Sequence, residues 1–286
     1  MHHTLPAIAV NGVIDMQISP LDRGFAYGDG VFETCRVVNA KIPLWTLHAE
    51  RLMISCKKLR IPVTLETVQN FLTKLFSQIA KEDLVVAIVK IIVTRGQGGR
   101  GYRLPDLVNP TICIGVFPAV SDPKFHCRQG VSVRICEQRL GCNVFLAGLK
   151  HLNRLENILA RAEWCDEKFA EGLLFDINDN LIEATASNIF IAKNNNLLTP
   201  DLTASGVAGV MRCLIIDELA PELGLTVNIK KLSQFDLQAA DEIFLCNSIF
   251  GIWPVVNIFD QQNYVYAIGK NTIALQKLLT NRFYQI

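Results

Sequence analysis

The stretch Gly148-Leu-Lys-His-Leu-Asn-Arg-Leu-Glu156 places a lysine between two leucines at the start of a helix-like pattern. The alkyl stem of Lys150 fits an apolar wall, but its ammonium is costly to bury without a partner. Two interpretations follow. Either the ammonium points to water or to a carboxylate, or the desolvated amine is a nucleophile able to form a Schiff base. The stretch by itself favours the first interpretation.

Size, charge and cysteine usage narrow the class of protein. The 286 residues suffice for one large or two ordinary domains, and a formal net charge of +1 argues against nucleic acid or an anionic membrane as the main partner. The nine cysteines are scattered, and the five histidines lack metal-ligand spacing, so we expect reduced thiols and no metal site. No signal peptide is expected, and the longest apolar run, residues 84–93, is too short for a bilayer. These features predict a cytoplasmic, soluble protein.

Residues 1–118 are predicted to form a smaller α/β domain. Asn11-Gly12 predicts a tight turn in a hairpin over residues 7–16. A strand over 31–38 is expected to return through 42–45, and Thr46 is a plausible helix cap. A second helix follows Thr64. The strand 84–94 is so apolar that both faces are expected to be covered. The segment 118–123 is typical of a linker.

Residues 119–286 are predicted to form a larger α/β domain. One helix is expected from about Asn153 to Phe169, a second from the small-residue loop 205–212 through Leu219, and a third over 271–282. Strands are expected at residues 131–136, 173–177, 181–184, 188–192, 197–198, 227–231, 242–247 and 255–259.

A glycine-rich loop follows the apolar strand. Gly96, Gly98 and Gly101 match the dinucleotide-binding pattern GxGxxG, which requires a helix after it. Two prolines within 104–110 oppose such a helix, so the pattern fails that test. A flexible loop that presents Arg100 and Tyr102 remains.

Several polar residues combine with Lys150. Glu183 lies in an otherwise apolar strand, although a lone glutamate there usually faces solvent. The helix that opens at Gly209-Val-Met211 offers unpaired N–H groups to an anion, and Arg51 and Ser248 are further candidates. A Schiff-base lysine, an acid for a pyridine nitrogen and a phosphate cradle are what pyridoxal phosphate needs.

The chain resembles the class IV pyridoxal-phosphate-dependent aminotransferase family over nearly its whole length. Within this family it is most similar to aminodeoxychorismate lyase, through residues 147–156, 95–102 and 246–255. The segments that carry the family resemblance are Asp22-Arg-Gly-Phe-Ala-Tyr-Gly-Asp-Gly-Val-Phe-Glu33, His48-Ala-Glu-Arg-Leu52, Ile182-Glu-Ala-Thr-Ala-Ser-Asn-Ile-Phe190, Gly206-Val-Ala-Gly-Val-Met-Arg212 and Asp241-Glu-Ile-Phe-Leu-Cys-Asn-Ser248.

The resemblance implies a two-domain fold like that of the D-amino-acid aminotransferases, a homodimer, and pyridoxal 5'-phosphate between the two domains. It assigns Lys150 to the Schiff base and to general base catalysis, and Glu183 to the pyridine nitrogen. Phosphate binding falls to Arg51, to the backbone of Val210 and Met211, and to the Ser248 hydroxyl. The candidates for substrate binding are Arg100, Tyr102, Tyr27 and Arg154.

The function implied by the resemblance is conversion of 4-amino-4-deoxychorismate to 4-aminobenzoate and pyruvate, a step toward folate. The alternative within the family is an aminotransferase for D- or branched-chain amino acids. Arg100 matches a position that binds substrate carboxylate across a dimer interface in the D-amino-acid enzymes. Tyr102 and Phe32 depart from them, since histidine and tyrosine stand there. From another class, a nucleotide-binding module around residues 96–101 remains an alternative.

Overall fold

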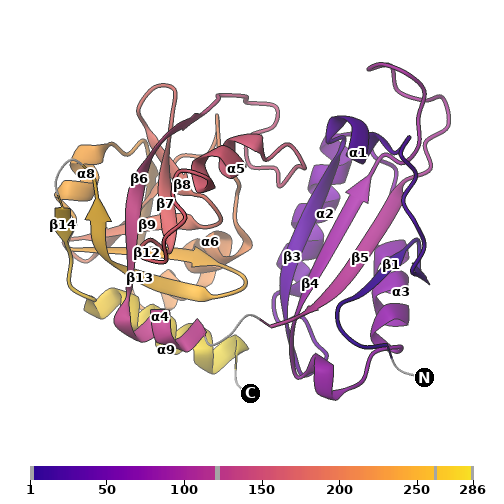
Figure 1. Ribbon diagram of the computed structural model, residues 1–286. Helices are drawn as coiled ribbons and strands as arrows, with labels where there is room; N and C mark the ends of the chain where they lie inside the picture. Colours follow the sequence, from indigo (N-terminus) through magenta and orange to yellow (C-terminus); the bar gives the residue numbers. More distant parts are fainter. Residues whose placement is uncertain (1–2, 120–122, 261–262, 285–286) are drawn as a thin grey trace. The chain divides into compact units, whose positions relative to one another are not determined.

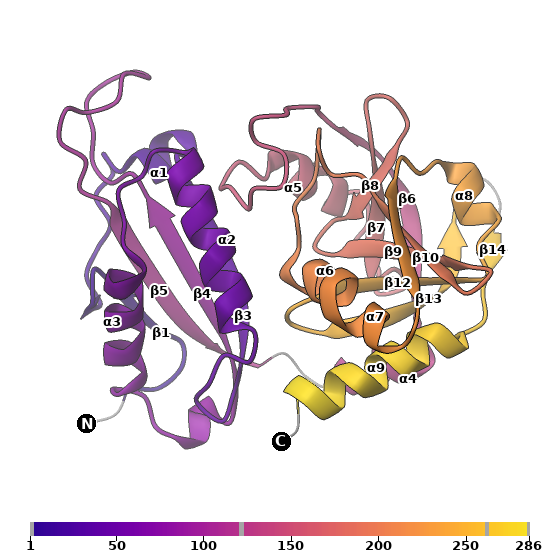
Figure 2. The ribbon, with the colours of Figure 1, turned by 180° about the vertical axis from the view of Figure 1, so that it is seen from behind.

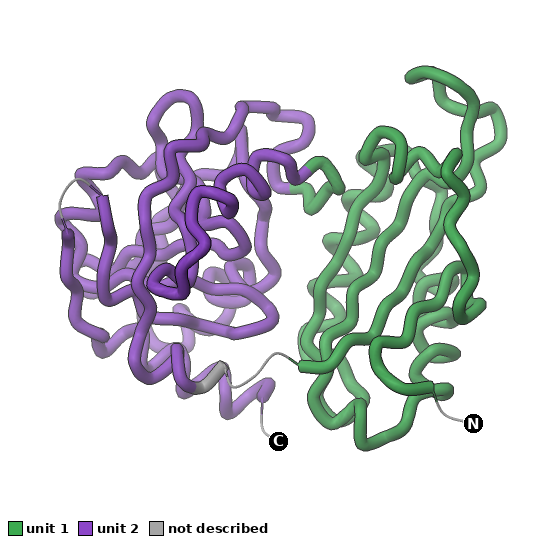
Figure 3. The backbone as a smooth tube through the Cα atoms, viewed as in Figure 1, with its two compact units in different colours: residues 1–120, 149–153, 286 green, residues 121–148, 154–285 purple. Residues whose placement is uncertain are grey.

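The computed structural model describes residues 3–119, 123–260 and 263–284 of the chain. The chain divides into two compact units (Figure 3). Unit 1 contains residues 1–120 and also 149–153, and unit 2 contains residues 121–148 and 154–285. Residues 120–122 of the expected linker lie outside the described residues. The lysine segment therefore groups with unit 1, although both of its flanks belong to unit 2.

Unit 1 is a five-stranded antiparallel sheet in the order β2-β1-β5-β4-β3. Helices α2 (Trp45–Lys58) and α3 (Leu65–Phe76) lie on the same face of this sheet in both views (Figures 1 and 2). The core is the layer between them and the sheet. The strands are β1 (Ala7–Val10), β2 (Val13–Ile14), β3 (Gly30–Val38), β4 (Val86–Thr94) and β5 (Thr111–Pro118), and the short helices are α1 (Arg23–Tyr27) and η1 (Glu82–Leu84).

Local signals in unit 1 are confirmed where they depend on backbone chemistry. Asn11 and Gly12 have φ angles of 50° and 75° and join β1 to β2, as the Asn-Gly pair predicts. The Thr64 side chain accepts a hydrogen bond from the Thr67 backbone and caps α3.

Three predictions in unit 1 are wrong. Residues 42–45 do not return as a strand, because Pro43 has no N–H for a ladder and α2 begins at Trp45, with Leu44 rather than Thr46 at its cap. Strand β4 is buried on one face and half-buried on the other. Its burial alternates, with Val89 and Ile91 buried and Lys90 half-buried, because both packed helices lie on one side of the sheet.

Unit 2 is built on a mixed sheet in the order β11-β10-β9-β12-β13-β6-β7-β8, with β14 paired to β13. Its parallel pairs are β10 with β11, β13 with β6, and β6 with β7. The strands are β6 (Val131–Leu140), β7 (Glu171–Asp176), β8 (Leu181–Ala184), β9 (Asn188–Lys193), β10 (Asn196–Pro200), β11 (Thr226–Lys230), β12 (Glu242–Asn247), β13 (Gly251–Phe259) and β14 (Asn263–Val265).

Helices α4 and α9 of unit 2 lie side by side in both views (Figures 1 and 2). A π-helical segment, η2, joins α6 to α7. No helix in the described ranges combines the length and apolar character needed to cross a bilayer. The helices are α4 (Pro123–Gln129), α5 (Leu155–Arg161), α6 (Val210–Leu214), η2 (Ile215–Leu219), α7 (Ala220–Glu222), α8 (Gln234–Gln238) and α9 (Lys270–Phe283).

Helix α5 is much shorter than the predicted helix over 153–169. It ends at Arg161, and the chain then turns so that Trp164 enters the core beside Leu140 and Leu174. The Trp164 indole N–H donates to the Phe169 carbonyl, 3.0 Å away. Burial of one large aromatic side chain thus outweighs the helical pattern of the segment.

Candidate active site

The backbone around Lys150 is attached to the edge of β3. The Lys150 carbonyl accepts from the Phe32 N–H at 2.9 Å, and the Leu152 N–H donates to the Gly30 carbonyl at 3.0 Å. The Lys150 ammonium lies 4.3 Å from the centre of the Phe32 ring. A lysine on a five-residue segment held in this way has a defined backbone position in unit 1.

Gly30 explains how the lysine segment comes so close to the sheet. A Cβ at this position would lie 2.5 Å from the Val93 carbonyl oxygen and 2.8 Å from Leu152 Cδ1. A larger residue would clash first with the backbone of β4 and would also displace the Leu152 side chain.

Two residues before Lys150, the chain pairs with a loop of unit 2. The Gly148 N–H donates to the Gly206 carbonyl at 3.0 Å, and the Ala208 N–H donates to the Gly148 carbonyl at 3.1 Å. Gly148 has a φ of 80°, a conformation that glycine adopts without strain. This loop leads directly into α6.

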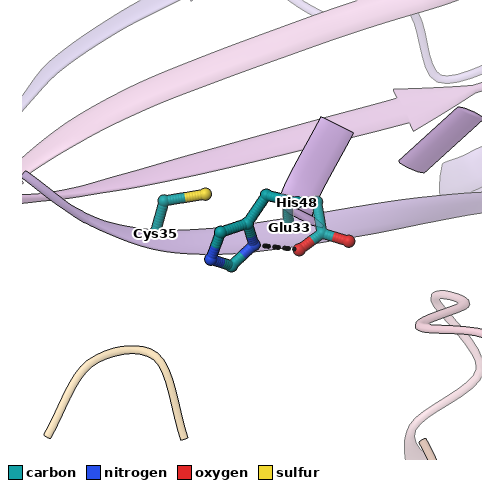
Figure 4. Close-up of side chains that lie close together, drawn as sticks. All are labelled: Glu33, Cys35 and His48. Atoms are coloured by element: carbon teal, nitrogen blue, oxygen red, sulfur yellow. Dashed lines mark hydrogen bonds and ion pairs between the residues drawn. The ribbon is translucent and has the colours of Figure 1, made fainter. Parts of the chain in front are cut away.

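Arg51 on α2 lies against a buried carboxylate of β3. Its Nε and Nη2 donate to the two oxygens of Glu33, at 2.8 and 2.5 Å. His48 Nδ1 is 2.7 Å from Glu33 Oε2 (Figure 4). Burial alone would raise the pKa of Glu33, but Arg51 and His48 outweigh it and hold that pKa below its usual range. The Arg51 side chain is only 13% exposed, so Arg51 is not an ordinary solvated arginine.

The pKa of His48 is lowered, first by burial and further by the charges of Arg51 and Lys150, against the opposing effect of Glu33. Both cations therefore lie near this imidazole. Cys35 is the third residue of Figure 4, and its thiol, like the ligand atoms of Glu33 and His48, lies within 4.8 Å of the others. Burial raises the pKa of Cys35 well above its usual range. A protonated thiol and a carboxylate already bonded to a guanidinium favour an ion-pair network over a metal centre.

Glu183 lies on β8 in unit 2 and is 4% exposed, so the solvent-facing interpretation is wrong. Its Oε2 accepts from the Val207 N–H at 2.8 Å. Val207 belongs to the loop that pairs with Gly148. The acid is thus held at a fixed place relative to the loop before α6.

Val210 and Met211 form the first turn of α6. Its cap residue is Gly209, which has no side-chain cap hydrogen bond. A Cβ at Gly209 would come 1.9 Å from Asn188 Oδ1, so a larger residue does not fit. The first N–H groups of this turn form the kind of donor set that suits an anion.

Ser248 follows β12, and the turn after this strand is connected to the turn between β8 and β9. The Asn247 side-chain amide donates to the Ala186 carbonyl at 3.1 Å. The β8–β9 turn is itself held by the buried carboxylate of Glu171, which accepts from Thr185, Ala186 and Ser187. Burial raises the pKa of Glu171. Unit 2 therefore orders Ser248 and Glu183 through adjoining turns.

The four candidates for substrate binding divide between the units. In unit 1 the Tyr27 hydroxyl accepts from the Gly101 N–H at 3.2 Å, and the Tyr27 and Tyr102 rings lie 5.6 Å apart. Arg100 stands beside Gly101 and is exposed. Arg154 belongs to unit 2, where burial lowers its pKa and Glu183 opposes that shift.

Sequence reasoning missed Glu33 and His48 as site residues. Both lie inside the segments that carry the family resemblance, and a histidine three residues before an arginine on one helix was the available signal. Only the tertiary structure shows that both contact the same carboxylate group.

Comparison with known proteins identifies the family of the chain. The model of the family described as amino-transferase class IV matches residues 30–258. The chain is 36% identical over 268 residues to aminodeoxychorismate lyase of Vibrio harveyi, covering 93% of this chain and 97% of that protein. It is 30% identical over 250 residues to D-alanine aminotransferase of Listeria innocua, covering 85% and 83%.

Among solved structures, the 4-amino-4-deoxychorismate lyase of Pseudomonas aeruginosa is 39% identical, with a TM-score of 0.89 and coverage of 96% of this chain and 98% of that one. The chain belongs to the class IV aminotransferase family. Its fold is the α/β fold of that family, as the sequence predicts.

Proposed function

We propose that this protein is a pyridoxal-phosphate-dependent lyase that converts 4-amino-4-deoxychorismate to 4-aminobenzoate and pyruvate. The observation that carries the proposal is Lys150 fixed on β3 in a chain whose relatives at 36% and 39% identity, over almost their full length, are aminodeoxychorismate lyases. The buried Glu183 supplies the acid that the chemistry requires.

The chemistry of the donor set fits pyridoxal phosphate. Arg51, the first amides of α6 at Val210 and Met211, and the Ser248 hydroxyl suit a phosphate dianion. Lys150 offers the amine for the aldehyde, and Glu183 offers a carboxylate for the pyridine nitrogen. When bound, the group supplies an electron sink for the electrons of a broken C–H bond.

In this proposal each residue has a defined task. Lys150 removes the proton from the amine-bearing carbon of the substrate as general base. The bond between the ring and the enolpyruvyl oxygen then breaks, pyruvate leaves with one proton, and the ring becomes aromatic. The Val207 N–H holds Glu183 in position, and Arg100 and Tyr102 bind the substrate carboxylates.

The test is a product assay on the purified protein with pyridoxal phosphate. We expect 4-aminobenzoate and pyruvate in equal amounts from 4-amino-4-deoxychorismate. Turnover of D-alanine or a branched-chain amino acid with 2-oxoglutarate, without turnover of aminodeoxychorismate, would contradict the lyase and support the aminotransferase alternative. The match to D-alanine aminotransferase is the observation that favours this alternative.

A matched pair of variants isolates the lysine. We expect Lys150→Ala to lose both the visible absorbance of the bound cofactor and the activity. Lys168→Ala, which removes a lysine that lies over the Phe259 ring in unit 2, is the control and keeps both. Full activity in Lys150→Ala would disprove the mechanism.

Two further features belong to the proposal. The family resemblance supports a homodimer. The nine free cysteines support a reducing compartment, the cytoplasm, since disulfides rarely persist there.

A further inference from the structure

The side chain of Arg23, the first residue of α1, joins two segments of unit 1. It is 4% exposed. Its Nε donates to Asp29 Oδ2 at 2.9 Å, and its Nη1 donates to the Gly101 carbonyl at 3.0 Å. Gly101 lies between Arg100 and Tyr102 in the loop 96–103, which we call the glycine-rich loop. One buried guanidinium thus connects the turn after α1 to the tip of that loop.

The other end of α1 holds the same glycine. The Tyr27 hydroxyl accepts from the Gly101 N–H at 3.2 Å, so both backbone polar groups of Gly101 are bonded to side chains of α1. The Arg23 guanidinium lies 4.9 Å from the centre of the Tyr27 ring, which couples the two contacts. Gly101 has a φ of 74°, so its own backbone favours glycine.

Backbone contacts attach the start of the loop to the same segment. The Arg23 N–H donates to the Gly96 carbonyl at 2.9 Å, and the Gly98 N–H donates to the Leu21 carbonyl at 3.4 Å. A Cβ at Gly98 would come 2.7 Å from Arg23 Cδ, so the loop passes directly over the arginine stem.

Asp29 connects this network to the root of the loop. Arg95, which is 3% exposed and directly follows β4, binds both oxygens of Asp29 at 2.7 and 2.9 Å. Arg95 also donates to the carbonyls of Leu59 and Arg60, which follow α2. Asp29 therefore binds two arginines, Arg95 just before the glycine-rich loop and Arg23 of α1, and these two ion pairs fix its position.

We propose that Arg23 is a positioning residue for substrate: it clamps the glycine-rich loop so that Arg100 and Tyr102 are held ready for the substrate carboxylates. This inference rests on the proposed function and adds to it the device that sets substrate affinity. Arg23 is buried and acts through the loop, whereas Arg100 and the 86% exposed Tyr102 make the contacts. An ordered loop loses less conformational entropy when substrate binds.

The first variant is Arg23→Met, which keeps the stem and removes the donors. We expect KM for 4-amino-4-deoxychorismate to rise about tenfold while kcat changes by less than about twofold. The reason is that a loosened loop must be ordered when substrate binds, which weakens binding and leaves the chemical step unchanged. Arg134→Met is the matched control. It removes a part-buried arginine of unit 2 that pairs with Glu163, and it leaves KM unchanged. An unchanged KM in Arg23→Met would overturn the proposal.

A double-mutant cycle separates positioning from a general structural role. In a protein that already carries Arg100→Ala and Tyr102→Ala, the two side chains that Arg23 positions are absent. Arg23→Met should therefore cause no further rise in KM. A further rise equal to that in the wild-type background would show that Arg23 acts elsewhere, and the proposal would fail.

Limited trypsin digestion tests the clamp without any assay of activity. Arg100 and Arg103 are exposed cleavage sites on the loop. We expect cleavage at these sites, identified by mass spectrometry, to be several-fold faster in Arg23→Met than in Arg134→Met. Equal rates would overturn the clamp. Absence of 4-aminobenzoate from the wild-type protein would defeat the proposed function alone, because the digestion result does not depend on it.

If Arg23→Met fails to fold, Arg23→Lys takes its place. A lysine keeps a cation beside Asp29, but its single ammonium cannot replace a fork that reaches both Asp29 and Gly101. The same rise in KM and the same faster cleavage are expected, and a wild-type KM with wild-type cleavage would contradict the proposal.

Discussion

His48 is a neutral group in a charged network. Its ring is 1% exposed and is bonded to Glu33, and burial lowers its pKa below the ordinary value of 6.5. Between these two pKa values, His48 is protonated in the unfolded chain and neutral in the folded chain. Stability contributed by this residue is complete above pH 6.5 and is lost as the pH falls from 6.5 through the lowered pKa.

A first prediction concerns this pH dependence. We expect the free energy of unfolding of the wild-type protein to fall below pH 6.5, with a contribution from His48 of at most about 1.4 kcal/mol per pH unit. His48→Gln can still donate to Glu33 but does not titrate, so its curve should be flatter. Urea unfolding at intervals from pH 7 downward measures both. Parallel curves for the two proteins would contradict the assignment of His48.

Glu183 gives a second prediction at this scale. Glu183→Gln keeps a side-chain oxygen for the Val207 N–H, so the melting temperature should change little. The charge that faces the cofactor in the proposed function is lost, and we expect kcat to fall about 10²-fold or more. Product assays and a thermal melt on the same preparation test the pair of outcomes. A stable, fully active variant would remove Glu183 from the mechanism.

Gly96, the first residue of the glycine-rich loop, sets the path of the chain out of β4. It has a φ of 83°, and a Cβ there would lie 1.8 Å from the Asn109 carbonyl oxygen, a backbone atom that cannot move aside easily. Gly99 in the same loop has no atom within 4 Å of such a Cβ. Substitution of Gly96 would therefore introduce strain and a clash, whereas the same substitution at Gly99 would only reduce the flexibility of the loop.

A third prediction uses this contrast. We expect Gly96→Ala to lower the free energy of unfolding by about 2 kcal/mol or more, from left-handed strain plus the clash. Gly99→Ala should change it by less than about 0.5 kcal/mol. Urea midpoints at constant slope give both values. A Gly96→Ala protein as stable as Gly99→Ala would mean that the path of the loop differs from that described.

At the scale of the whole molecule, the proposed homodimer leads to a complementation experiment. The family resemblance places Arg100 at a position that, in the D-amino-acid aminotransferases, binds substrate across the dimer interface. Alone, Lys150→Ala should be inactive, and Arg100→Ala, whose KM is raised, should have low activity when the substrate is dilute. Mixed and allowed to exchange subunits, they should regain activity, because some sites then receive an intact residue of each kind.

Light scattering after gel filtration checks the premise, with a mass twice that of the chain expected. If the protein is a dimer and activity is not regained, Arg100 and Lys150 act in the active site of the same subunit. A monomer would remove the homodimer from the proposal.

Local features were determined by the sequence alone. Asn11-Gly12 adopts its tight turn and Thr64 caps α3, because these residues act on their own backbone or on a neighbour three positions away. The family resemblance also singled out Lys150 and Glu183, since motif residues are recognisable without knowledge of their surroundings.

The tertiary structure alone decided the rest. Burial of Trp164 ended α5 after Arg161, and alternation in β4 depended on which face the helices cover. Phe32 and Lys150 are 118 positions apart along the chain yet share a backbone hydrogen bond, and Arg23 binds Gly101 across 78 positions. Contacts of that range arise from packing of whole elements, which the pattern of neighbouring residues does not encode.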